Sequence, residues 1–104
     1  MHPQPKDFTS YAKSLIKSTT HTVFDIRMEL MSIQCHIESR KKYKECLSQN
    51  EAHHFLGFPS NYYTSVFESI DYEVGYCEAV HQQLQDICSL LEEKVETLEG
   101  FLKN

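Results

Sequence analysis

Residues 63–102 read YTSVFESIDYEVGYCEAVHQQLQDICSLLEEKVETLEGFL, and a side chain suited to packing recurs there at alternating steps of four and three residues. This spacing is a heptad repeat, whose positions a and d form one stripe of an α-helix. We therefore expect a helix over 61–103, about 60 Å long at 1.5 Å per residue. The stripe, called the C-terminal seam below, comprises Tyr63, Phe67, Ile70, Val74, Cys77, His81, Leu84, Cys88, Leu91, Val95, Leu98 and Leu102.

A second helix is expected over 7–48, because neither proline nor glycine occurs between Lys6 and Leu56. Asp7, directly after Pro5 and Lys6, is a candidate N-cap. Beyond residue 37 the apolar pattern weakens, and a connection over 49–60 carries Gly57 and Pro59. The apolar positions of this helix are Ala12, Ile16, Val23, Ile26, Leu30, Ile33 and Ile37, widened by Phe8, Leu15 and Phe24.

The charges favour an antiparallel pairing of these helices. Net charge is +2 over residues 1–52 and −7 over residues 53–104. A hairpin folded about residue 55 places the basic cluster 40–44 near the acidic residues of 68–73, and Lys13 and Lys17 near Glu96 and Glu93. Exposed pairs contribute only about 0.2–1 kcal/mol each, enough to bias the direction of pairing. We predict an all-α fold of two long antiparallel helices, a helical hairpin.

The apolar stripe of residues 61–103 is wider than one partner helix can cover. Val66, Val80, Ile87 and Phe101 each precede a seam position by one residue. A two-helix hairpin would leave part of this face in water, so we expect it to complete a four-helix bundle or coiled coil by association. The partner would be a second copy or another helical subunit. The predicted interface comprises Phe67, Ile70, Val74, Cys77, His81, Leu84, Cys88, Leu91, Val95 and Leu98 with Ile26, Leu30, Ile33 and Ile37.

The composition of the chain indicates which class of protein it belongs to. The chain has 104 residues, 40% of them hydrophobic and 24% charged, which is typical of a single domain over 1–104. Charge-free runs are too short and too polar for a transmembrane segment. The polar start MHPQPKDFTSY does not resemble a signal peptide, and four cysteines without a C-x-x-C pair indicate reduced thiols. These features favour a cytoplasmic or nuclear location.

A metal site is the main chemical alternative to packing at the seam. Cys77 and His81 lie one helical turn apart, and antiparallel folding would bring Cys35 and His36 to a similar height. Cys77 and His81 also occupy successive seam positions, where a thiol and an imidazole are ordinary packing residues. We expect packing, with no metal and no cofactor. A histidine in a seam can instead specify register and make assembly sensitive to acid.

Two other segments carry alternatives. RKKYK at 40–44 could serve a nucleic-acid or acidic-membrane adaptor, but a pI of about 5.6 and acidic residues in the same hairpin favour intramolecular neutralisation, so nucleic acid is not the expected partner. In the connection, His53 and His54 are expected to be ordinary loop residues. Phe55, Leu56 and Phe58 would cap the bundle or form a docking surface.

No enzymatic motif is present in the sequence, which lacks a glycine-rich phosphate loop, a nucleophile elbow and H-E-x-x-H. FLGF at 55–58, followed by DYEVGYCEAVHQQL at 71–84, resembles the start of a family of kinetochore proteins in which an F-x-G-F segment precedes a long helix. In that family the segment lies at the N-terminus, whereas here it follows a long helix. We predict a non-enzymatic interaction or oligomerisation module, a scaffold or adaptor subunit; the resemblance implies a kinetochore-type structural subunit as an alternative.

Overall fold

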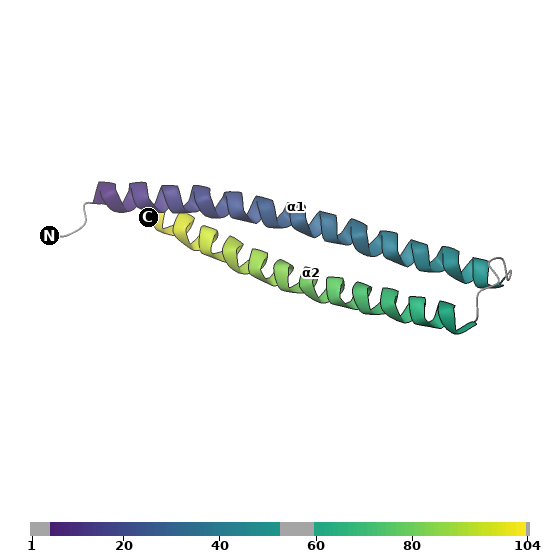
Figure 1. Cartoon of the computed structure of the whole chain (residues 1–104). Coiled ribbons are helices and arrows are strands. Elements are labelled where there is room, and N and C mark those ends of the chain that lie inside the picture. Colours follow the sequence, from purple (N-terminus) through teal and green to yellow (C-terminus); the bar gives the residue numbers. More distant parts are fainter. Residues whose placement is uncertain (1–4, 53–59, 104) are drawn as a thin grey trace. The chain divides into compact units, whose positions relative to one another are not determined.

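The computed structural model describes the backbone of residues 5–52 and 60–103 and the side chains of residues 8–49 and 62–103. Both described segments are single α-helices, α1 (Pro5–Ala52) and α2 (Ser60–Lys103), and no strand occurs in these segments (Figure 1). The predicted all-α fold of two long helices is confirmed. The segment that holds His53, His54, Phe55, Leu56 and Phe58 lies outside the described residues.

The ends of α1 extend past the predicted ones. The helix begins at Pro5, so Asp7 stands inside the first turn and is not the N-cap. Proline is well suited to the first turn, because its missing N–H would have no partner there. At the other end α1 continues to Ala52 rather than stopping near Ser48, since no proline or glycine interrupts the chain before Gly57.

The contacts between helices divide the chain into two units. Unit 1 joins residues 5–30 of α1 to 83–103 of α2, and unit 2 joins residues 31–52 of α1 to 60–82 of α2. The beginning of α1 therefore pairs with the end of α2, and the end of α1 with the beginning of α2. This is the antiparallel arrangement of a helical hairpin, as the sequence predicts.

The core of unit 2 is a cluster formed by Ile37, Ile70 and Val74. Ile70 is 1% exposed and is the largest fully buried side chain among the described residues. Partly buried side chains from both helices surround this trio, so α1 and α2 interdigitate here as the heptad spacing requires. The surrounding residues are Ile33, Leu47, Val66 and Cys77.

The stripe of α1, whose apolar pattern weakens beyond residue 37 in the sequence, continues through Arg40 and Lys44, both half-buried. Lys44 Nζ lies 2.7 Å from Asp71 Oδ1 and 5.7 Å from the centre of the Phe67 ring. Long basic side chains can cover apolar surface with their methylene groups while their charged ends reach water or a carboxylate. The two basic residues thus fill stripe positions that a count of apolar residues leaves empty.

Unit 1 has a thinner core. Ala12, Val23 and Cys88 are its buried side chains, and the other stripe residues of both helices are half-buried. Two of these three side chains are small, so they bury little apolar surface. The contact between the helices in unit 1 therefore leaves much of its apolar material at the surface.

Candidate interaction surface

A heptad frame describes which side chains face the neighbouring helix. In α1 the a positions include Val23, Ile37 and Lys44, and in α2 they include Val74 and Cys88. Every a and d side chain described in either helix is buried or half-buried. The side chains at the flanking e and g positions therefore form the surface of each unit beside the contact between its helices.

The predicted interface residues lie along the contact between α1 and α2. Ile37, Ile70, Val74 and Cys88 are buried, and the remaining members of the set are half-buried. A hairpin must use these residues to pair its own helices, so they are first of all its internal packing. Their contact with another chain stays a prediction.

One flank of each unit is charged. In unit 1 the e-position residue Arg27 donates a hydrogen bond to Glu92, also at e, and this bond together with the charge of Glu92 raises the pKa of the guanidinium above its ordinary value. In unit 2 another pair of e residues, Lys41 and Glu78, lies 3.4 Å apart between Nζ and Oε2. We call this side of each unit its charged flank.

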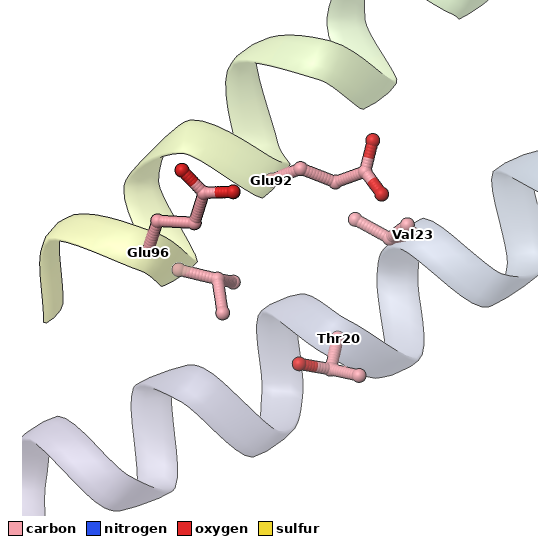
Figure 2. Close-up of a pocket in the computed structure, with 5 residues that line it drawn as sticks. Thr20, Val23, Glu92 and Glu96 are labelled. Atoms are coloured by element: carbon pink, nitrogen blue, oxygen red, sulfur yellow. The ribbon is translucent and has the colours of Figure 1, made fainter. Parts of the chain in front are cut away.

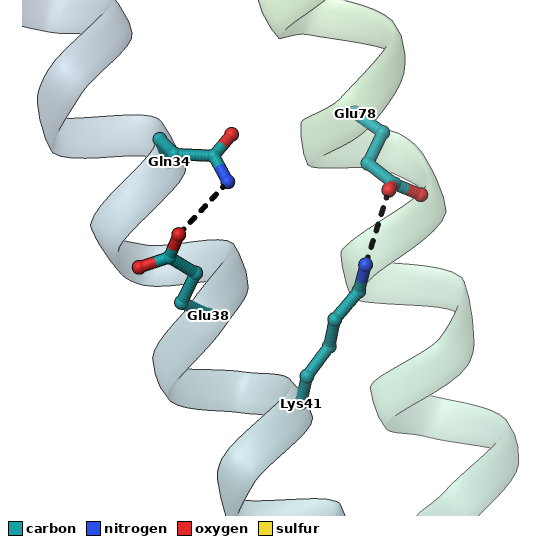
Figure 3. A network of polar contacts seen from close by, with 4 residues as sticks. All are labelled: Gln34, Glu38, Lys41 and Glu78. Atoms are coloured by element: carbon teal, nitrogen blue, oxygen red, sulfur yellow. Dashed lines mark hydrogen bonds and ion pairs between the residues drawn. The ribbon is translucent and has the colours of Figure 1, made fainter.

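The charged flank of unit 2 also holds a short polar network (Figure 3). Gln34 Nε2 donates to Glu38 Oε1 at 3.2 Å, one turn along α1, while Lys41 reaches across to Glu78 on α2. All four residues are exposed. Such surface contacts orient the helices but contribute little to stability.

The opposite flank of unit 1 is apolar. Phe8 and Leu15 of α1 and Ile87 and Phe101 of α2 occupy g positions, and in antiparallel helices the g positions of both helices fall on the same side. Tyr11 and Leu90 occupy the neighbouring c positions. All six side chains are exposed, from 38% for Leu15 to 68% for Tyr11. We call this set the apolar flank of unit 1.

Two hollows mark the two flanks of unit 1. The one on the charged flank, about 230 Å³, is lined by Thr20, Val23, Glu92, Val95 and Glu96; Figure 2 shows Glu92 and Glu96 on one helix and Thr20 and Val23 on the other. The second hollow, about 380 Å³, opens on the apolar flank. Its lining brings both helices together and consists of Leu15, Leu90, Glu93, Lys94, Thr97 and Leu98.

In unit 2 the corresponding g positions are polar in part. Glu73 accepts contacts from two α1 residues: His36 Nε2 lies 3.5 Å from Oε2, and Arg40 Nε lies 2.7 Å from Oε1. The Arg40 Nε is buried but not aligned for a hydrogen bond. Arg40 also stacks over Tyr43, 5.1 Å from the ring centre. This flank of unit 2 carries ion pairs beside its exposed tyrosines, Tyr43, Tyr62 and Tyr76, so it is more polar than the apolar flank of unit 1.

The residues considered for a metal site are not gathered into one. Cys77 and His81 are half-buried at seam positions, Cys35 is exposed, and His36 lies beside Glu73. No group of three or more His, Cys, Asp or Glu side chains within residues 8–49 and 62–103 is placed to hold a metal ion. All four cysteines are free thiols.

The basic cluster 40–44 is largely matched by acids of the same unit. Arg40, Lys41 and Lys44 pair with Glu73, Glu78 and Asp71. Lys41 reaches further along α2 than the predicted segment 68–73.

The charge pairing predicted for unit 1 is not found. Among its described side chains, neither Lys13 nor Lys17 forms an ion pair with Glu96 or Glu93. Arg27 makes the cross-helix ion pair of this unit instead.

Sequence reasoning placed some outward residues in the stripe. Phe24 was expected to widen it, but Phe24 occupies a b position and is 60% exposed. Tyr11 and Leu90 were not singled out at all. The heptad frame contains the signal that finds them, because c and g positions of an antiparallel pair share one flank.

Comparison with known proteins places the chain in no family: no family model, curated protein or solved structure matches it. Neither α1 nor α2, over the residues described, contains a stretch both long and apolar enough to span a bilayer.

Proposed function

We propose that this chain is a non-enzymatic helical interaction module that joins protein components by completing a larger helical bundle. The observation that carries the proposal is the imbalance between buried and exposed apolar side chains. Among described residues, only Ala12, Val23, Ile37, Tyr63, Ile70, Val74 and Cys88 are buried, whereas thirteen large hydrophobic side chains are exposed.

The total surface supports the same proposal. The chain exposes 8254 Å², whereas a folded monomer of 12.2 kDa exposes about 6,100 Å² on the usual scaling with mass. The excess of about 2,200 Å² on one chain is larger than the roughly 800 Å² that each partner buries in an interface of standard size. A helical partner would remove this surface from water.

The basic cluster provides weaker support for a nucleic-acid adaptor. Three of its four cations already have carboxylate partners within unit 2, so binding phosphate would require breaking those pairs. The acidic total charge of −5 would add long-range repulsion.

The proposal is tested by chemical cross-linking in cells together with light scattering of the purified chain. The matched variant replaces exposed side chains with glutamine: Tyr11→Gln, Phe24→Gln, Met28→Gln, Leu90→Gln and Phe101→Gln. We expect the natural chain to form complexes, with itself or another protein, that the variant loses while its helical circular dichroism is kept. A monomeric natural chain with the same cross-linked proteins as the variant would overturn the proposal.

A further inference from the structure

We propose that two copies of this chain pair through the apolar flank of unit 1, related by a two-fold axis. The flank comprises Phe8, Tyr11 and Leu15 of α1 and Ile87, Leu90 and Phe101 of α2. The inference rests on the proposed function and gives it a surface and a partner. It concerns a different surface from the interface expected from the sequence, whose residues lie along the contact between α1 and α2.

The six residues form a continuous surface rather than scattered exposed side chains. Phe8, Tyr11 and Leu15 follow one another at steps of three and four on α1, so they share one helix face. Leu15 and Leu90 line the same hollow, which joins the two helices. Ile87 lies one turn before Leu90, and Phe101 lies one turn beyond Thr97, another lining residue.

The exposed area is large enough to mark an interaction site. Phe8, Tyr11 and Phe101 are 50%, 68% and 60% exposed. Aromatic side chains offer about 150–250 Å² each, so these three alone leave roughly 350 Å² uncovered. With the three aliphatic members the patch exceeds the few hundred Å² that monomeric proteins usually expose.

Two hydroxyl groups on this flank already donate hydrogen bonds within their own helix. Thr97 Oγ1 donates to the backbone oxygen of Glu93 at 3.0 Å, and Thr22 Oγ1 donates to that of Ser18 at 3.1 Å. Both hydroxyl groups therefore satisfy their donors without water, and covering them costs little. The hollow is lined by one acid, Glu93, and one base, Lys94, so no excess of like charge opposes an apolar partner.

A second copy of the chain fits the apolar flank of unit 1 better than it fits the charged flank of that unit. The charged flank of unit 1 already closes on itself through Arg27 and Glu92, so among the described residues of unit 1 the apolar flank is the side that exposes large apolar side chains from both helices. Pairing two such flanks makes a four-helix arrangement with one self-complementary interface, which closes as a dimer and does not propagate. The six flank side chains expose roughly 600 Å² on each copy, so two copies would bury about 1,200 Å² together, the lower limit of a standard dimer interface.

Sedimentation equilibrium of the full chain tests this pairing. The flank variant Leu15→Glu with Leu90→Glu places a charge from each helix in the interface, and we expect it to be monomeric where the natural chain is dimeric, with Kd raised at least a hundredfold. The control Phe24→Glu with Met28→Glu adds the same charge at exposed positions of the same unit outside the flank. It should remain dimeric. A milder pair, Tyr11→Gln with Phe101→Gln, should weaken the dimer about tenfold.

The outcomes are separable. A monomeric natural chain overturns self-pairing, as does a control variant that dissociates as readily as the flank variant. If the monomeric chain still cross-links to a different protein, the interaction function stands and only the identity of the partner is wrong. If the monomer has no partner in cells, both proposals fail. Circular dichroism on each variant verifies that the helices are intact.

Discussion

Tyr63 carries a buried hydroxyl group for which the described residues offer no hydrogen-bond partner. The side chain is 4% exposed, and its Oη has no partner in the part of the chain that the structure describes. The ring contributes instead through aromatic contacts, edge-on to Tyr62 and tilted against Phe67. A buried polar atom without a partner lowers stability, because its bond to water is lost on folding and nothing replaces it.

We therefore expect Tyr63→Phe to leave the free energy of unfolding unchanged or to raise it by about 1 kcal/mol. The ring contacts are retained, and only the unpaired hydroxyl is removed. Urea denaturation followed by circular dichroism measures the change. A loss of 1 kcal/mol or more would show that the hydroxyl has a partner in solution.

Ile70 is expected to be the costliest single truncation in unit 2. The side chain is 1% exposed at the centre of the Ile37 and Val74 cluster, so Ile70→Ala removes buried methyl groups and leaves a cavity. The expected loss is about 2–5 kcal/mol. Met31→Ala, a truncation of similar size at a side chain 63% exposed, should cost less than about 1 kcal/mol. Similar losses from both variants would contradict the placement of the core.

At the scale of the helix, Arg40 and Lys44 explain why the apolar pattern of α1 weakens beyond residue 37 although its packing stripe continues. A periodicity defined by apolar residue types misses these two positions, because they carry cations. Their stems nevertheless occupy the stripe, and their charged groups end on Glu73 and Asp71. Residue type therefore identified the start of the stripe correctly, while its continuation depended on the partner helix.

The packing role of Lys44 can be separated from its charge. Lys44→Met keeps an unbranched apolar stem and removes the ion pair with Asp71, so we expect it to change the free energy of unfolding by less than about 0.5 kcal/mol. Lys44→Ala removes the stem as well and should cost about 1 kcal/mol or more. If both variants lose the same amount, the charge rather than the stem is what stabilises this part of α1. Thermal denaturation at low and high salt provides the comparison.

Gly75 lies inside α2 with no contact that demands it. A Cβ atom built at this position meets nothing within 4 Å. Glycine in the interior of a helix is less favourable than alanine by about 0.5–1 kcal/mol, so Gly75→Ala should stabilise the chain by that amount. A variant that is more stable to urea but assembles less well would identify Gly75 as a point where another chain approaches α2 closely.

At the scale of the whole molecule, the sequence was sufficient to predict the two helices but not to predict which side chains lie on their outer faces. A long heptad run predicted α2, and a long stretch without proline or glycine predicted α1. The seam residues lie along the contact between α1 and α2, and their contact with another chain stays a prediction. Whether a residue such as Leu15 or Phe24 points to a flank or to the far side depends on the heptad position. The two side chains are equally hydrophobic in a composition count, but one lies at g and the other at b.

Assembly through an exposed apolar surface also determines how stability depends on concentration. If folding and pairing are coupled, each tenfold rise in chain concentration adds about 1.4 kcal/mol to the free energy of unfolding of the dimer. For two chains of this length, the midpoint of thermal unfolding should rise by about 3–6 °C per tenfold.

The Leu15→Glu with Leu90→Glu variant should unfold at a midpoint that does not move with concentration, because it has lost the coupling. The natural chain and the Phe24→Glu with Met28→Glu control should both show the shift. Salt separates this dependence from charge effects: screening weakens exposed pairs such as Lys41 with Glu78, but it leaves apolar pairing in place. A midpoint that is independent of concentration in the natural chain would mean that the hairpin reaches its full stability without a second copy.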